Sequence, residues 1–162
     1  MNFVEVFKKF DYSGQALNFI IENSESMYSP YHNLNHNISI TIFSYFNAVS
    51  EKIDKKQMKE LLLASIFHDF NHTAGESNGV TNIKNAKLGV KEFVSKNKIN
   101  VDLNTINKNI DATEFPYKIS DEDLDIQQKI IRDSDILQLV EPNRLQSNCF
   151  GLQKTPKKAP VL

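Results

Sequence analysis

The chain has 162 residues, of which 40% are hydrophobic and 24% are charged, and its formal net charge is −1. This length suits one globular domain that buries about 70% of its unfolded surface. The balanced charge gives no general attraction to nucleic acid or to an anionic membrane, which argues against both as partners. The sequence contains no apolar run close to the roughly 20 residues that span a bilayer.

Cysteine usage and the first residues bear on the compartment. The single cysteine, Cys149, excludes an intrachain disulfide framework and favours a reducing environment. The stretch from Met1 to Phe10 mixes charged residues among apolar ones and lacks the apolar core of a signal peptide. We therefore expect a cytoplasmic protein.

Apolar residues recur at helical spacing through most of the chain, and no strand-like alternation competes with this pattern. The spacing predicts helices over Phe3–Phe10 and Ala16–Ile21, followed by a polar loop over Asn23–Pro30. A long helix from about Leu34 to Val49 carries one of the four histidines, His36.

The next predicted helix opens at Asp54–Gln57, which resembles a capping box. It is densely apolar toward its end at His68-Asp69, so we expect it to be central and buried. Thr73–Gly79 contains two glycines and small polar residues and predicts a loop. Loops beside rigid elements often carry functional residues.

Three further helices are expected in the second half of the chain. They lie around Asn82–Ser95, around Leu103–Ile110 and after Ser120–Asp123, whose acidic residues suit a helix N-terminus. The last helix runs to about Val140 and ends before Pro142.

The predicted fold is all-α, a compact single-domain helical bundle. We assign residues 1–150 to this domain and residues 151–162 to a flexible basic tail, because the latter are polar, lysine-rich and contain prolines.

All four histidines lie in two short clusters, Tyr31-His32-Asn33-Leu34-Asn35-His36 and His68-Asp69-Phe70-Asn71-His72. Residues four apart share one face of a helix, so two such pairs on facing helices could converge. Imidazole and carboxylate ligands suit Zn, Mn, Fe and similar divalent ions. The clusters therefore predict a metal site that contains His36, His68 and Asp69.

A later carboxylate would complete this ligand set. Asp135 is the better candidate because it interrupts an apolar helical stretch, and a buried carboxylate is costly unless it is paired or bound to metal. Asp133 is the rival, and its direction differs from that of Asp135 by about 200° around a helix.

The order His36, His68-Asp69 and Asp135 resembles the H…HD…D signature of the HD-domain metal-dependent phosphohydrolases. Two segments are closest to the cyclic-nucleotide phosphodiesterase branch: Tyr31-His32-Asn33-x-x-His36, and His68-Asp69-x-x-His72 followed by Gly75 and Asn78. Ala112-Thr113-Glu114 is a weaker echo of the Ala-Thr-Asp stretch of that branch. The resemblance extends from about Tyr31 to Leu137.

The resemblance implies an HD-type helical domain that binds one or two divalent ions, with Zn, Mg, Mn and Fe as candidates. It implies that the first ion is bound by four residues, His36, His68, Asp69 and Asp135. Asp69 would also bridge to a second ion, and a hydroxide between the ions would attack phosphorus. His32 would donate a proton to the leaving oxygen, and His72 would orient the nucleophile or contact phosphate.

Weaker assignments concern the surroundings of these ligands. Asn33 and Asn78 could hold the site residues in place, although Asn78 could equally serve the geometry of its loop. Thr113 and Glu114 could contact the water shell of a second ion, or form a solvated helix terminus. Gln146 and Phe150 are the candidates for purine recognition.

The leading expectation is a nucleotide phosphodiesterase, acting on a cyclic mononucleotide or a related phosphodiester. A nucleotide phosphomonoesterase or an alarmone pyrophosphohydrolase is the nearest competing activity. Two more distant possibilities are a non-catalytic HD module that binds a nucleotide or a partner, and an HD oxygenase with a di-iron centre.

Overall fold

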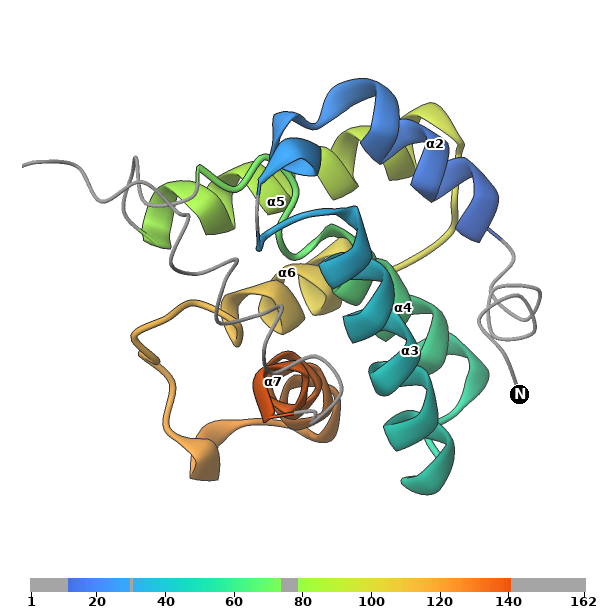
Figure 1. Cartoon of the computed structure of the whole chain (residues 1–162). Helices are drawn as coiled ribbons and strands as arrows, with labels where there is room; N and C mark the ends of the chain where they lie inside the picture. Colours follow the sequence, from blue (N-terminus) through green and yellow to red (C-terminus); the bar gives the residue numbers. More distant parts are fainter. Residues whose placement is uncertain (1–11, 30, 74–78, 141–162) are drawn as a thin grey trace, which may run out of the picture.

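The computed structural model describes residues 12–29, 31–73 and 79–140, and its described part is helical without any β-strand. The all-α prediction is therefore confirmed for this part of the chain. The described residues form six α-helices and two short 3-10 helices: α2 (Ser13–Asn23), η1 (Glu25–Tyr28), α3 (Leu34–Ser50), α4 (Lys55–Phe67), α5 (Gly79–Lys96), α6 (Leu103–Asp111), η2 (Asp121–Asp123) and α7 (Ile126–Val140). Figure 1 shows how the α-helices are arranged. The predicted helix over residues 3–10, Pro142 and the basic tail lie outside the described residues.

Helix α4 is the central element, as its apolar sequence predicts. It packs against all five other α-helices, and every residue from Glu60 to Phe67 is buried. The predicted capping box is confirmed, because the Asp54 carboxylate accepts from the Gln57 amide and the Gln57 side chain accepts from the Asp54 amide. Two orphan donors at the start of the helix are thereby satisfied.

Aromatic rings fill the core between α2, α4 and α5. The rings of Phe19 and Phe67 each lie with their centroids 5.2–5.9 Å from those of Phe70 and Phe93, and 5.9 Å from each other. Gly89 on α5 faces the Phe70 ring so closely that a Cβ atom there would overlap it. The glycine thus lets α5 approach the turn that follows α4.

The predicted start of the last helix is wrong by several residues. The Ser120 side chain accepts from the Glu122 amide, but the turn that it caps is the short 3-10 helix η2. Leu124 is then extended and buried, which interrupts the helical path. Helix α7 begins after Asp125, whose carboxylate accepts from the Gln128 amide while the Gln128 side chain accepts from the Asp125 amide.

Two other boundaries differ slightly. The predicted loop over residues 23–30 contains η1, and the helix expected around Asn82–Ser95 begins earlier, at Gly79. The helices expected over 34–49 and 103–110 are confirmed.

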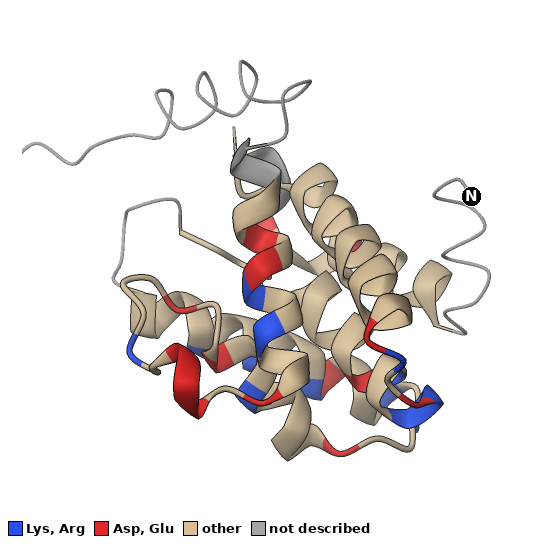
Figure 2. Ribbon diagram, turned by 90° about the horizontal axis from the view of Figure 1, so that it is seen from below, with Lys and Arg blue, Asp and Glu red and all other residues tan. Residues whose placement is uncertain are grey.

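Basic and acidic residues are interspersed along the ribbon in Figure 2, in keeping with the small net charge. Within the described residues, none of the helices combines the length and apolar character that crossing a membrane requires.

Candidate metal centre

The two histidine clusters lie where α3 begins and where α4 ends. His36 is in the first turn of α3, whereas His32 precedes this helix. His68 is the first residue after α4, and His72 follows in a turn. The prediction that each pair shares a helix face is therefore wrong, although the expected convergence of the clusters is observed.

Asn33 sets the start of α3. Its side-chain oxygen accepts from the His36 amide at 3.2 Å, and its Nδ2 atom donates to the Ser29 carbonyl at 3.1 Å. A residue in this capping position has non-helical backbone angles, so the preceding His32 leaves the helix axis. Asn33 thus positions both histidines through the backbone.

Asn71 shapes the turn after α4. Its φ angle of 54° lies in the left-handed region, which asparagine tolerates better than most residues. The Asn71 side chain accepts from the Glu25 amide at 2.8 Å, and the Ser24 hydroxyl accepts from the Asn71 amide at 3.0 Å. These bonds, with Phe70 anchored in the core, bring His72 back beside the end of α4.

Three buried side chains form the inner group: His36, His68 and Asp69. The Nε2 atoms of His36 and His68 lie 3.1 Å apart, and Asp69 Oδ2 lies 3.1 Å and 3.5 Å from them, respectively. The His68 Nδ1 atom bonds to the Ser65 carbonyl at 2.8 Å, so it carries the proton. The Nε2 lone pair of a neutral His68 is then directed to the group, the arrangement typical of a metal ligand.

Helix α7 brings Asp135 to the same point. Its Oδ1 atom lies 3.3 Å from His36 Nε2 and 3.9 Å from His68 Nε2. Asp133 is exposed and lies instead in a surface hollow beside Tyr117 and Arg132. The structure therefore brings Asp135, and not Asp133, to the two histidines.

The inner group has a strong affinity for positive charge. Burial disfavours protonation of His36, but the Asp135 and Asp69 carboxylates outweigh it and raise the pKa of His36 to about 10. Burial also disfavours the charged form of Asp69. The neighbouring histidines outweigh this effect of burial and hold the pKa of Asp69 well below its usual value. The pKa of Asp135 is lowered in the same way, mainly by its hydrogen bond with His36.

His32 and His72 form an outer pair. Their rings are stacked with centroids 3.6 Å apart, and His32 Nδ1 lies 2.8 Å from Asp69 Oδ2. The Asn82 Nδ2 atom donates to His72 Nε2 at 3.0 Å, so a neutral His72 carries its proton on Nδ1. Burial lowers the pKa of His72 to about 4, which keeps this ring neutral near pH 7.

The outer pair borders a cavity of about 260 Å³. Asp69 and Asp135 line it from one side, and Thr113 and Glu114 line it from the loop after α6. Glu114 accepts from Lys118 at 2.6 Å, so its carboxylate already has a cationic partner. Thr113 and Glu114, which the sequence indicated only weakly, thus line the cavity, although Glu114 is paired with Lys118.

Four residues named from the sequence remain to be placed: Tyr31, Asn78, Gln146 and Phe150. Tyr31 is buried, with its ring centroid 5.0 Å from that of His36. Asn78, Gln146 and Phe150 lie outside the described residues.

The sequence interpretation missed two residues that shape the site, Asn71 and Asn82. A signal for Asn71 existed, because asparagine readily adopts a left-handed conformation in turns. Asn82 had none: it lies ten residues after His72, and only the packing of α5 beside the turn brings them together.

The donor set fits a divalent cation. Two groups of three side chains, His36 with His68 and Asp69, and His32 with Asp69 and His72, have potential ligand atoms within 4.8 Å of one another. These nitrogen and oxygen donors suit Zn, Mn or Fe. Comparisons of the chain with protein-family models, curated proteins and solved structures find no match.

Proposed function

We propose that the protein is an HD-type metal-dependent phosphoester hydrolase that acts on a nucleotide. The observation that carries this proposal is the position of a buried His/His/Asp group next to a cavity bordered by two further histidines. A metal site that served stability alone would need no open hollow and no extra titratable groups beside it.

His36, His68, Asp69 and Asp135 would hold the ion. When bound, a divalent ion lowers the pKa of a water molecule and offsets charge on phosphoryl oxygens. The Ser65 carbonyl would keep His68 in the tautomer that ligation requires. Asp69 is well placed to serve a second ion, because its Oδ2 atom lies 3.1 Å from His36 Nε2 and 2.8 Å from His32 Nδ1, between the inner group and the outer pair.

His32 would protonate the leaving oxygen. Its Nδ1 atom is held by the Asp69 carboxylate, which leaves Nε2 as the atom for proton transfer. The stacked His72 ring is neutral and would donate a hydrogen bond from Nδ1 to phosphate or to the nucleophile. This division of roles follows from the different partners of the two rings, Asp69 for one and Asn82 for the other.

A phosphodiester is the favoured substrate class, with cyclic mononucleotides as the leading examples. The resemblance of residues 31–36 and 68–72 to the cyclic-nucleotide phosphodiesterase branch supports this choice, and His32 could protonate the alcohol that leaves. Nucleoside monophosphates and pyrophosphorylated nucleotides form the competing class.

Activity assays on the purified chain test this proposal. The protein is stripped with a chelator, reloaded separately with Zn²⁺, Mn²⁺, Mg²⁺ or Fe²⁺, and offered 3′,5′-cyclic AMP, cyclic GMP, nucleoside monophosphates and guanosine tetraphosphate. We expect metal-dependent hydrolysis of a diester, and loss of it on His32→Asn substitution without loss of the ion.

The same assays discriminate between the competing functions. Hydrolysis of monoesters alone would exclude the phosphodiesterase assignment. Metal binding without hydrolysis of any of these compounds would favour a binding module instead.

A further inference from the structure

A second hollow, of about 420 Å³, lies beside the site between α5, α6 and the loop after α6. We call it the lysine groove. Ile83 and Glu114 line both this groove and the smaller cavity, so the two spaces are neighbours. Residues of the groove that matter here are Val80, Lys84, Lys87, Leu88, Lys91 and Lys118.

The groove has an excess of positive charge, although the chain as a whole is slightly acidic. Four lysines and only two carboxylates line it. Lys87 pairs with Asp111 and Lys118 pairs with Glu114. Lys84 and Lys91 are exposed and form no ion pair with another described residue, so they are available to an anionic ligand.

The lysines of α5 share one side of the helix. Lys84, Lys87 and Lys91 have the i, i+3 and i+7 spacing of a single helix face. Lys87 is already paired with Asp111, so Lys84 and Lys91 supply the charge that an anionic ligand would meet on this face.

Exposed apolar side chains accompany the lysines. Val80 and Leu88 are 55% and 53% exposed and line the same groove. An apolar surface with a few cationic groups matches a nucleoside that carries a phosphate. The smaller cavity is below the range of about 300–1,000 Å³ that is typical of sites for small molecules, whereas the groove extends it into that range.

We propose that the lysine groove binds a second phosphate group of the substrate, so that the preferred ligand is a nucleotide phosphodiester that carries a further, separate phosphate group. This inference rests on the proposed function. One phosphate would lie at the candidate metal centre, the second would contact Lys84 and Lys91, and the nucleoside would pack on Val80 and Leu88. A cyclic mononucleotide, with a single phosphate, would leave the groove unused.

Titration calorimetry on the full chain loaded with Mn²⁺ tests the proposal through binding. The probes are adenosine 5′-monophosphate and adenosine 3′,5′-bisphosphate, whose integrity is checked by chromatography after each titration. We expect the bisphosphate to bind about tenfold more tightly, as two exposed charge pairs allow. This preference should decrease with added salt, because exposed charges are screened.

The double variant Lys84→Glu/Lys91→Glu should remove the preference and leave monophosphate binding and metal content unchanged. Lys52→Glu/Lys55→Glu is the matched control, because it makes the same charge change at exposed positions. These positions lie at the N-terminal end of α4, whereas the candidate metal centre lies at its C-terminal end. Lys84→Gln/Lys91→Gln, monitored by circular dichroism, replaces the charge-reversed variant if that variant unfolds.

Equal affinity for both probes in the wild-type protein would overturn the inference. A preference that survives in both groove variants would overturn it equally. Absence of hydrolysis together with an intact, groove-dependent preference would instead remove the proposed hydrolase activity and leave the second phosphate site standing.

Discussion

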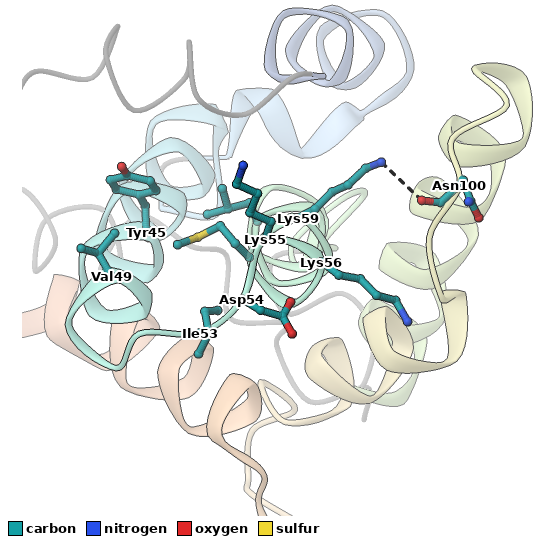
Figure 3. Close-up of a pocket in the computed structure, with 10 residues that line it drawn as sticks. Tyr45, Val49, Ile53, Asp54, Lys55, Lys56, Lys59 and Asn100 are labelled. Atoms are coloured by element: carbon teal, nitrogen blue, oxygen red, sulfur yellow. Dashed lines mark hydrogen bonds between the residues drawn. The ribbon is translucent and has the colours of Figure 1, made fainter.

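The two ends of helix α4 border hollows of very different character. At its N-terminal end a hollow of about 750 Å³ is lined by apolar side chains such as Tyr45 and Val49, and by three lysines (Figure 3). At its C-terminal end the cavity measures about 260 Å³ and is lined by histidines and carboxylates. The potential metal ligands and proton-transfer groups therefore line the smaller hollow and not the larger one.

The polar groups at the two ends are also satisfied differently. In the larger hollow, Lys59 donates to the Asn100 carbonyl (Figure 3). The Asp54 carboxylate there accepts from the Gln57 amide and caps the helix. In the smaller one, His36 and Asp69 have strongly shifted pKa values because each faces several titratable partners. Convergent groups with perturbed pKa values indicate a functional site better than the size of a hollow does.

His68→Ala should give the largest effect. Removing a ligand from the buried group should abolish tight metal binding and reduce hydrolysis by more than about 100-fold, beyond the loss expected for an outer-shell partner. Metal content by atomic emission and initial rates provide the measurement. Lys55→Ala, at the opposite end of α4, should change neither quantity, and equal losses in both variants would break the contrast between the two ends.

Asp135→Asn comes next. It keeps the shape of the side chain and removes its charge, so metal affinity should decrease by at least the about 10–100-fold that losing a hydrogen-bond partner of a ligand costs. Asp133→Asn is the matched control on the same helix, because Asp133 is exposed. Competition with a chromogenic chelator measures both affinities. A larger loss of affinity in Asp133→Asn than in Asp135→Asn would show that Asp135 is not the fourth ligand.

The metal-free protein should show a pH dependence that originates at the centre. The pKa of His36 is raised from 6.5 to about 10 in the folded chain, so protonated His36 stabilises the fold fully below about pH 6.5. This contribution is lost as the pH rises through about 10. Urea unfolding of chelator-treated protein should therefore show a fall in stability across this window, and His36→Gln should flatten it. Parallel curves for the two proteins would contradict the assignment.

The smallest effect is expected at the other end of the helix. Asp54→Ala removes the N-cap of α4 and should lower the free energy of unfolding by about 1 kcal/mol. Metal content should remain unchanged, since the cap and the ligands His68 and Asp69 lie at opposite ends of α4. Asp123→Ala, at an exposed carboxylate of η2, is the comparison for a surface change without a capping role. Loss of metal in Asp54→Ala would show that the two ends are coupled.

Local signals determined much of the helical architecture. The capping box at Asp54–Gln57 and the apolar run before His68 predicted the central helix, because both depend on near neighbours in the chain. The start of α7 was mispredicted because the acidic run at Ser120–Asp123 resembles a cap equally well. Burial of Leu124 against the core, a tertiary contact, places the helix start after Asp125.

The sequence by itself determined which residue types gather at the centre, since the two histidine clusters and their spacing are local features. Tertiary structure alone decided how they meet. Asn33 caps α3 and leaves His32 outside that helix, and Asn71 turns the chain back after α4. Helix α7 brings Asp135 to His36 from 99 positions away. Asn82 contacts His72 from α5, a helix that packs closely on the Phe70 turn at Gly89. Contacts of this kind depend on packing between elements, which no short stretch of sequence encodes.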